Sequence, residues 1–393
     1  MSRAPCVMLV AAEASGDALG AELARALRRR LGEGGVRFVG VGGARMAEEG
    51  IVSPFDIGEL SVLGLLEGLM AYRRVVARAD QTAELAVREQ PDIAVLIDSW
   101  GFTLRVARRL KRRLPSLPII KYVAPQVWAS RPGRARTLAR TVDHLLAIHS
   151  FDAPYFEPHG LATTFVGNAT LARDFSSADP AGLRAQLGVA ADAPLLLVLP
   201  GSRPAEIARM TPPFADAVAR LRRDRPDLAV VVAAANSVAE AVRQSLATYP
   251  PGVHLIEGDN ARYDAMRAAT TALACSGTVT TELGLAGCPM VVAYRIGAVT
   301  YTLLKPLIKT PYASLINIAA GAEIAPEFIQ ARCTGQVLAA AVAERLDDPA
   351  LRARQIAAQN AALDKMGRGL RDPSETAAEA VAAMIANGPR SLS

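Results

Sequence analysis

The stretch 195-LLLVLPGSRPAEI-207 joins an apolar run to a glycine-containing turn and a helix start. The run predicts a buried strand. In the turn, Gly201 allows the backbone to approach a ligand closely, and Arg203 can donate two hydrogen bonds to phosphate oxygens. Pro204 suits the first turn of a helix. The stretch therefore predicts a pyrophosphate site at the end of a strand, and the alternative is a capped helix with a solvent-facing arginine.

Similar strand-and-helix units are expected on both sides of this stretch. Short apolar runs alternate with longer segments of helical period, which is typical of βαβ units around a parallel sheet. The first series of runs covers residues 6–12, 36–41, 93–98, 119–124, 144–149 and 163–166. The second series covers residues 195–199, 228–234, 253–257, 272–275 and 290–294. The chain is therefore predicted to be an α/β protein with two Rossmann-like, doubly wound parallel sheets that face a cleft.

The length of the chain also favours two domains, because 393 residues exceed what one hydrophobic core usually holds. We expect an N-terminal domain over residues 1–172 and a C-terminal domain over residues 173–345. Residues 346–393 are rich in alanine and have a helical pattern, with a break near residues 367–373. They are expected to form the helices that end the chain.

The composition limits the functions that the chain can have. Hydrophobic residues make up 51% and charged residues 21%, as in globular enzymes. No apolar run reaches the roughly 18–20 residues that span a bilayer, and no secretion signal precedes the first expected strand, so we expect a cytoplasmic protein. Four cysteines without a CxxC pair, four histidines without an HxxxH or HExxH pattern, and the lack of a DxD motif argue against a disulfide framework and metal catalysis.

The charge of the chain favours an anionic partner. The formal net charge is +6, and arginines are concentrated at residues 28–30, 108–113 and 131–140. A nucleotide diphosphate or an anionic lipid fits this charge. We expect no nucleic acid partner, because aromatic residues make up only 5% and no recognition helix, zinc finger or RNP-like strand is present.

Two turns at predicted strand ends in the first half carry candidate site residues. The sequence EASGD at 13–17 follows the first strand; either Ser15 or Asp17 caps the next helix, or the amides at the start of that helix hold an acceptor sugar or a phosphate. Asp98 ends another strand, and it either caps the next helix or acts as the general base that takes the proton of an attacking sugar hydroxyl.

A turn in the C-terminal half has the composition of a nucleotide site. Residues 275–282 read CSGTVTTE, a strand end followed by a turn that contains glycine and hydroxyl groups. Ser276, Gly277 and Thr278 would meet a diphosphate, and the carboxylate of Glu282 would accept hydrogen bonds from the ribose hydroxyls. The alternative is a helix N-cap at Ser276 or Thr278, with Glu282 as a favourable charge in the first turn.

Residues 61–76 form an apolar stretch with basic residues at its end. Such a stripe belongs either to the core or to a contact with acyl chains and a membrane. The sequence leaves both interpretations open.

Several ordered motifs resemble those of bacterial lipid A disaccharide synthases, which are inverting glycosyltransferases with the GT-B fold. The resemblance covers nearly the whole chain. The matching stretches are EASGD at 13–17, GVGGARM at 40–46, ELSVLGLLE at 59–67, PQVWA at 125–129, LPGSRPAEI at 199–207, SGTVTTELGLAGCPMVVAYR at 276–295 and PEFIQ at 326–330.

The resemblance implies a reaction and its setting. Members of the family transfer 2,3-diacylglucosamine from UDP to 2,3-diacylglucosamine 1-phosphate, which gives the β-1,6-linked lipid A disaccharide 1-phosphate and UDP. They use no metal and no other cofactor, and they are peripheral proteins on the cytoplasmic face of the inner membrane. The final helices are expected to pack back on the first domain, or to be exchanged in a homodimer.

The resemblance also implies roles for individual residues. Asp98 is the expected catalytic carboxylate. The expected UDP-binding residues are Arg203, Ser276, Gly277, Thr278 and Glu282, with Asn317 and Gln330 lining the donor cleft. The expected residues of the acceptor and donor cleft are Glu13, Ser15, Gly16, Asp17 and Gln126. The expected acyl-chain and membrane contacts are Val62, Leu63, Leu65, Leu66 and Leu69.

The chain departs from the family pattern at three places on the expected acceptor side. Residues 99–103 read SWGFT where the family usually has the run Pro-Asp/Glu-Phe-Asn/Thr. Residues 149–152 read HSFD where Leu-Pro-Phe-Glu is common. Residues 166–169 read VGNA where Val-Gly-His-Pro is common. Two rival functions stay open. One is another GT-B enzyme on UDP-N-acetylglucosamine-type substrates, such as an epimerase or the peptidoglycan precursor transferase, and the other is a UDP-binding, membrane-associated protein without catalysis.

Overall fold

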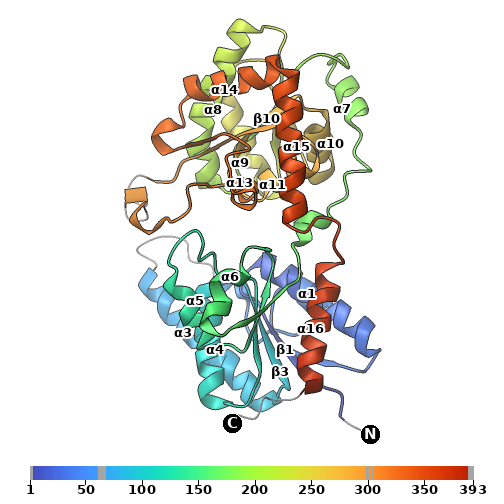
Figure 1. The fold of residues 1–393 in the computed structure, drawn as a ribbon, viewed down its shortest axis with the longest axis vertical. Helices are drawn as coiled ribbons and strands as arrows, with labels where there is room; N and C mark the ends of the chain where they lie inside the picture. The colour runs from blue at the N-terminus through green and yellow to red at the C-terminus, as the bar shows by residue number, and fades with distance from the viewer. Residues whose placement is uncertain (1–2, 61–67, 298–300, 303–304, 388–393) are drawn as a thin grey trace. The chain divides into compact units, whose positions relative to one another are not determined.

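The computed structural model describes residues 3–60, 68–297, 301–302 and 305–387. The chain forms two compact units (Figure 1). Unit 1 comprises Met1–Asn168 and Leu370–Ser393, and unit 2 comprises Ala169–Gly369. Each unit has its own parallel sheet.

The sheet of unit 1 has six strands in the order β2-β1-β3-β4-β5-β6. The strands are β1 Cys6–Val10, β2 Arg37–Val41, β3 Ile93–Ile97, β4 Ile119–Tyr122, β5 His144–Ala147 and β6 Ala162–Phe165. The helices of the unit are α1 Ala14–Leu31, α2 Ala44–Glu48, α3 Gly68–Glu89, α4 Trp100–Arg113, α5 Gly133–Ala139, α6 Ala153–Phe156 and α16 Pro373–Asn387. The strand order reverses between β1 and β3, so the loops after these two strands meet at one edge of the sheet.

The sheet of unit 2 also has six strands, in the order β12-β11-β10-β7-β8-β9. The strands are β7 Leu195–Leu199, β8 Ala229–Ala234, β9 His254–Glu257, β10 Thr271–Cys275, β11 Met290–Tyr294 and β12 Glu327–Ile329. The helices are α7 Pro180–Gln186, α8 Pro204–Asp224, α9 Ala239–Ser245, α10 Asp259–Ala268, α11 Val279–Leu285, α13 Leu315–Ala320, α14 Gly335–Asp347 and α15 Pro349–Lys365. The order reverses between β7 and β10. The two series of predicted strands therefore form two Rossmann-like sheets.

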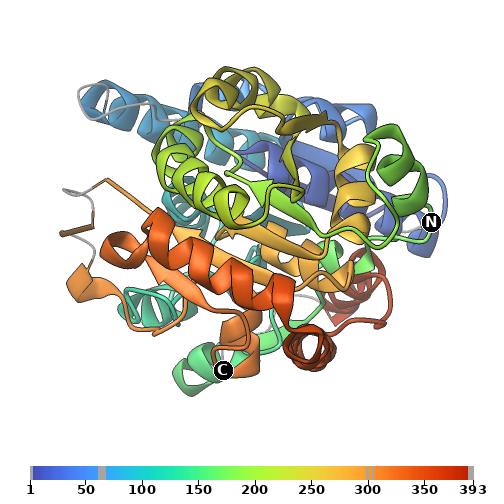
Figure 2. The same cartoon turned by 90° about the horizontal axis from the view of Figure 1, so that it is seen from above.

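The central strands of both sheets are covered on both faces. Every residue of β1, β3, β7 and β10 is buried, which explains why their sequences are apolar without alternation. In unit 2, helices α8 and α14 pack side by side (Figure 2, yellow-green and orange). Phe214 of α8 and Val342 of α14 belong to the same core cluster as Val198 of β7.

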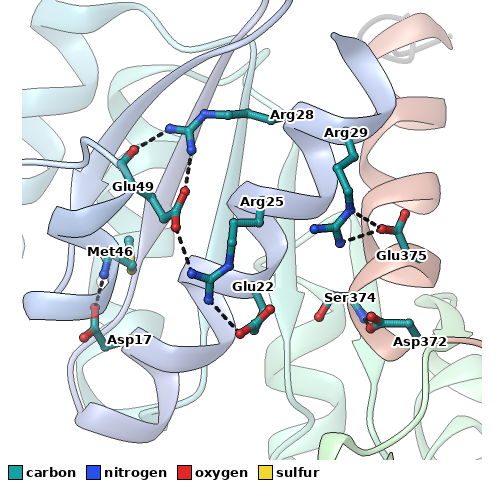
Figure 3. A network of polar contacts seen from close by, with 10 residues as sticks. All are labelled: Asp17, Glu22, Arg25, Arg28, Arg29, Met46, Glu49, Asp372, Ser374 and Glu375. Carbon is teal, nitrogen blue, oxygen red and sulfur yellow. Dashed lines mark hydrogen bonds and ion pairs between the residues drawn. The ribbon is translucent and has the colours of Figure 1, made fainter. Parts of the chain in front are cut away.

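The last helix, α16, packs against α1 in unit 1, as the resemblance implies. Ala377 and Val381 of α16 belong to the same core cluster as Leu23 of α1. At the surface, Nε of Arg29 donates a hydrogen bond of 2.8 Å to Oε1 of Glu375 (Figure 3). The end of the chain thus completes the first unit.

Helix α15 differs from this expectation, because it packs in unit 2. The buried side-chain amides of Gln355 and Gln359 donate hydrogen bonds to the backbone carbonyls of Met290 (2.8 Å) and Cys288 (3.0 Å). These bonds tie α15 to the start of β11. Of the expected returning segment, only the part from Leu370 onward belongs to unit 1.

Candidate functional site

A cavity of about 200 Å³ lies in unit 2 at the reversal of strand order between β7 and β10. Ligands of open α/β sheets bind beyond the carboxyl ends of strands at such a reversal. The cavity is lined by Arg173, Leu199, Gly201, Ser202, Glu206, Ala233, Ala235, Arg262, Cys275, Ser276, Gly277, Thr278, Val279 and Glu282. Both turns that the sequence singles out in this half of the chain therefore contribute to one cavity.

The turn after β7 needs its glycine and carries Arg203, which is not among the residues that line the cavity. Gly201 has a φ of +135°, and a Cβ at this position would lie 2.9 Å from the Cβ of Glu206. The side chain of Arg203 is 75% exposed, and its Nη1 lies 2.8 Å from Oε1 of the buried Glu206. The hydroxyl of Tyr294 donates to the same oxygen at 3.2 Å. Burial and the neighbouring Glu206 carboxylate raise the pKa of Tyr294 to about 12, so the phenol remains a donor.

The turn after β10 presents small polar groups to the cavity. Gly277 and Thr278 are exposed, and Oγ of Ser276 donates to the carbonyl of Ala313 at 3.0 Å. Thr278 occupies the N-cap position of α11 without a side-chain cap bond. The alternative interpretation is therefore correct in the positions of Thr278 and Glu282, but no side-chain hydroxyl caps the helix.

Glu282 lies in the first turn of α11, but it is buried and paired. Its Oε1 forms an ion pair with Arg173, and its Oε2 lies 3.6 Å from Nη2 of Arg262. The Nε atom of Arg262 has no hydrogen-bond partner in the part of the chain that the structure describes. The cavity is thus lined by two carboxylates, Glu206 and Glu282, and by the guanidinium groups of Arg173 and Arg262. No sequence motif points to either arginine.

Asn317 and Gln330 are not among the residues that line this cavity. The side chain of Asn317 is completely buried, and it donates to the carbonyl of Ala325 and to Glu327, both at 2.7 Å. Its Oδ1 accepts from two backbone amides, so Asn317 holds the segment before β12 in place. Gln330 follows β12 with a φ of +54°, and its buried Nε2 has no partner among the described residues. Gln330 therefore has a free donor, whereas Asn317 has none.

Asp98 lies at the corresponding reversal of unit 1, directly after β3. Asp98 and Ser99 have φ values of +48° and +38°, a left-handed conformation that costs a non-glycine residue about 1–2 kcal/mol. Asp98 is half-buried, and its carboxylate makes no hydrogen bond or ion pair within the described ranges. Ser99, not Asp98, occupies the N-cap position of α4. The capping alternative for Asp98 is therefore wrong, and the carboxylate is available for chemistry.

The loop after β1 meets the same edge of the sheet. Glu13 and Ser15 are exposed, whereas Gly16 is buried, and a Cβ on Gly16 would lie 3.6 Å from the carbonyl oxygen of Ile97. Asp17 is buried and does not cap its own helix. Its carboxylate accepts hydrogen bonds from the backbone amides of Gly43 (2.7 Å), Arg45 (3.0 Å) and Met46 (3.0 Å; Figure 3), so it caps α2. Of these motif residues, Glu13 and Ser15 are accessible to a ligand.

The remaining expected site residues lie either in the loop after β4 or outside the residues that the structure describes. Gln126 is exposed in the loop that follows β4. Val62, Leu63, Leu65 and Leu66, together with the side chain of Leu69, fall outside the described residues. In the described ranges, no helix combines the length and apolarity needed to cross a membrane. The same ranges contain no cluster of three or more His, Cys, Asp or Glu side chains that could hold a metal ion.

Comparison with known proteins identifies the family to which the chain belongs. Residues 7–381 match the family model described as lipid-A-disaccharide synthetase. The lipid-A-disaccharide synthase of Rhodospirillum centenum is 43% identical over 379 residues, which cover 96% of this chain and 94% of that protein. That of Paramagnetospirillum magneticum is 41% identical over 97% of this chain and 98% of that protein. The chain belongs to the lipid-A-disaccharide synthase family.

Solved structures confirm the GT-B fold of this family member. A glycotransferase of kitacinnamycin, 18% identical, has a TM-score of 0.61 and covers 97% of this chain and 99% of its own. A putative UDP-N-acetylglucosamine 2-epimerase from Listeria monocytogenes, 16% identical, has a TM-score of 0.60 and covers 96% of this chain and 95% of its own. At such identities the likeness concerns the fold alone. The family shows that the chain is a glycosyltransferase of lipid A biosynthesis.

One departure from the lipid-A-disaccharide synthase pattern forms a buried polar cluster. Asp152, in the HSFD segment, accepts a hydrogen bond of 3.1 Å from Nε1 of Trp128 in the PQVWA motif. Burial raises the pKa of Asp152 to about 7 and lowers the pKa of His149 to about 4. His149 stacks on Phe151 with a centroid distance of 5.1 Å. The altered segment is therefore packed against a family motif.

Proposed function

We propose that this chain transfers 2,3-diacylglucosamine from UDP to 2,3-diacylglucosamine 1-phosphate, and so forms the β-1,6-linked lipid A disaccharide 1-phosphate and UDP. The observation that carries the proposal is the unit 2 cavity, where two glycine-bearing turns, Arg203 and Glu282 lie around the reversal of strand order in a member of this family. A nucleotide diphosphate fits such a site, because amides, hydroxyls and a guanidinium can surround its phosphates.

In this proposal the cavity holds the UDP part of the donor. Arg203, Ser276, Gly277 and Thr278 contact the diphosphate, and Glu282 accepts hydrogen bonds from the ribose. Arg173 and Arg262, which pair with Glu282, line the same cavity and add positive charge where the nucleotide would bind. Gln330 stays a proposed residue of the donor site, because its buried Nε2 has no partner among the described residues, although it does not line this cavity. Asn317 acts through the segment that it holds in place.

The chemical step is a single displacement. The oxygen of the acceptor 6-hydroxyl attacks the anomeric carbon, the bond from that carbon to the UDP oxygen breaks, and UDP leaves with the electron pair. Asp98 takes the hydroxyl proton. Arg203 stabilises the negative charge that develops on UDP, which is the task of a metal in other transferases. One displacement inverts the anomeric configuration.

The proposal is tested by incubating the purified protein with UDP-2,3-diacylglucosamine and 2,3-diacylglucosamine 1-phosphate, with and without EDTA. We expect equal amounts of disaccharide and UDP, and the same rate in EDTA. Turnover of non-acylated UDP-N-acetylglucosamine in place of the acylated donor would favour the epimerase-like rival. Binding of UDP without any sugar transfer would favour the non-catalytic one.

We also propose that unit 1 contacts an anionic membrane through a basic groove of about 970 Å³ between α3, α4 and α5. The groove is lined by Tyr72, Val76, Trp100, Leu104, Arg105, Arg108, Arg109, Lys111, Arg112, Arg136, Thr137, Arg140 and Thr141. Ion pairs join Arg109 to Asp80 and Lys111 to Asp143. The arginines without an ion pair to any described residue are Arg105, Arg108, Arg112, Arg136 and Arg140. Such a surface attracts lipid phosphates.

The double variant Arg108→Glu/Arg140→Glu tests this contact. Each basic residue near an anionic surface contributes about 1 kcal/mol, so the variant should bind phosphatidylglycerol vesicles at least about 30-fold more weakly in a sedimentation assay. The control is Arg209→Glu/Arg223→Glu, with both substitutions on α8 of unit 2. It has the same net charge as the groove variant and should bind like the wild type. Equal loss in both variants, or equal binding to phosphatidylcholine vesicles, contradicts a groove-specific contact.

A further inference from the structure

A buried lysine lies behind the loop that carries Asp98. Lys121, in β4, is only 3% exposed and forms no ion pair with any described residue. Its Nζ donates a hydrogen bond to the backbone carbonyl of Asp98 and lies 3.0 Å from Oγ1 of Thr103. Its stem lies among apolar side chains such as Leu96 and Val142. Burying an ammonium group costs free energy, so its presence calls for a specific contact that an apolar residue could not make.

That contact is at the left-handed corner between β3 and α4. The two consecutive left-handed residues, Asp98 and Ser99, are held by three groups from outside the corner. The amide of Asp98 donates to the carbonyl of Tyr122 at 2.9 Å. Oγ1 of Thr103 lies 2.9 Å from the carbonyl oxygens of both Asp98 and Ser99 and donates its one proton there. Lys121 adds the one charged donor, and it does so at the carbonyl of Asp98 itself.

The arrangement separates the backbone of Asp98 from its side chain. The backbone groups are held from β4 and α4, whereas the carboxylate is half-buried and has no partner among the described residues. A strained strand-to-helix turn is a known way to present a reactive side chain at a sheet edge. Holding such a turn requires contacts that outweigh its strain.

We propose that Lys121 is a positioning residue for the transfer reaction, because its buried ammonium holds the carbonyl of Asp98 and thereby fixes the corner that presents the Asp98 carboxylate to the acceptor hydroxyl. The inference rests on the proposed function, in which Asp98 takes the proton. Lys121 itself touches neither substrate nor the reacting atoms.

The pH dependence of the rate distinguishes a positioning role of Lys121 from a purely structural one, because it depends on whether the amine is protonated. Burial lowers the pKa of Lys121 to about 7, although the charges of Asp98 and Glu13 oppose this shift. The α4 side contributes the neutral Thr103, and the other neighbours are apolar. A charged donor makes a stronger hydrogen bond than a neutral amine. The bond to Asp98 should therefore weaken as the pH rises through about 7.

The free energy of unfolding should rise with pH, whereas the hydrogen bond from Lys121 to Asp98 weakens. The folded-state pKa lies below the ordinary lysine value of 10.5, so the unfolded chain binds more protons between about pH 7 and 10.5. The penalty for burying the ammonium is complete below about pH 7, and the contribution of this group to stability rises with pH above it. The variant Lys121→Met should lose this rise and should not be less stable than the wild type near pH 6.

The test compares Lys121→Met, Lys121→Gln and the wild type in the disaccharide assay between pH 6 and 9. We expect Lys121→Met to lower kcat about 10- to 100-fold near pH 7, because small misplacements of reacting groups have effects of this size. The affinity for UDP and the KM for the donor should stay within twofold. Lys121→Gln, which keeps an uncharged donor, should recover part of kcat, and its rate should not show the fall with pH that the wild type shows. Lys365→Met in unit 2 serves as the control with unchanged kcat.

Two outcomes overturn the inference while leaving the proposed function intact. One is a kcat for Lys121→Met within twofold of the wild type while Asp98→Asn is inactive. The other is a loss of kcat together with equal losses of UDP affinity and of unfolding temperature, with the pH profile unchanged, which indicates a structural role only. If the wild type forms no disaccharide, the proposed function fails, and the positioning role fails with it.

Discussion

Asp98→Asn should lower kcat about 100- to 10,000-fold, because removing a general base usually has an effect of this size. The amide has nearly the shape of the carboxylate but cannot take the acceptor proton. Since the carboxylate has no partner among the described residues, the unfolding temperature should remain within about 1 °C of the wild type. The measurement is single-turnover formation of the disaccharide at saturating substrates, with the UDP affinity measured in parallel.

The matched control for this variant is Glu48→Gln, which removes one exposed carboxylate from α2 of the same unit. Its kcat should equal that of the wild type. If Asp98→Asn retains more than about one tenth of wild-type kcat, the proton passes to another group. The exposed Glu13, after β1 at the same sheet edge, would then be the first candidate.

Arg203→Ala should weaken UDP binding about 10- to 100-fold, as expected for the loss of a hydrogen bond between a guanidinium and a phosphate. The rate of transfer should also fall, because charge on the leaving UDP would be less stabilised. Folding should be little affected, since the side chain of Arg203 is 75% exposed and Glu206 keeps the hydrogen bond from Tyr294. Titration calorimetry with UDP measures the first effect directly.

Arg209→Ala, further along the exposed side of α8, is the control for the loss of a positive charge. UDP should bind to it as to the wild type. Equal affinities for UDP in Arg203→Ala and the wild type would remove Arg203 from the diphosphate site, whatever the effect on the overall rate.

Much of the fold can be predicted from the sequence, because strands of a parallel sheet with both faces covered are apolar throughout. Runs such as residues 195–199 coincide with a strand. The sequence predicts the ends of other strands less accurately. The predicted run 119–124 is longer than β4, which ends at Tyr122. The strand ends there because Val123 has a φ of +73° and the chain leaves the sheet. Strand β12 was missed, since it has three residues and carries the buried Glu327.

The site was predictable only where its residues follow a strand. The turns at 201–203 and 276–278 line or border the cavity, because parallel strands bring their carboxyl ends to one edge. Arg173 and Arg262 were missed, since no local pattern relates either residue to Glu282 and only the tertiary fold brings them together. Lys121 was hidden inside an apolar run. The alternative in which Asp17 caps the helix that follows β1 is wrong, because the amides that it caps lie in a separate turn.

A crystal structure of the protein with bound UDP is the most direct test of the account. We predict the diphosphate within hydrogen-bond distance of Arg203 and of the turn at residues 276–278, and the ribose hydroxyls on the carboxylate of Glu282. UDP bound away from the reversal between β7 and β10, with Arg203 and Glu282 still paired only to protein groups, would contradict it.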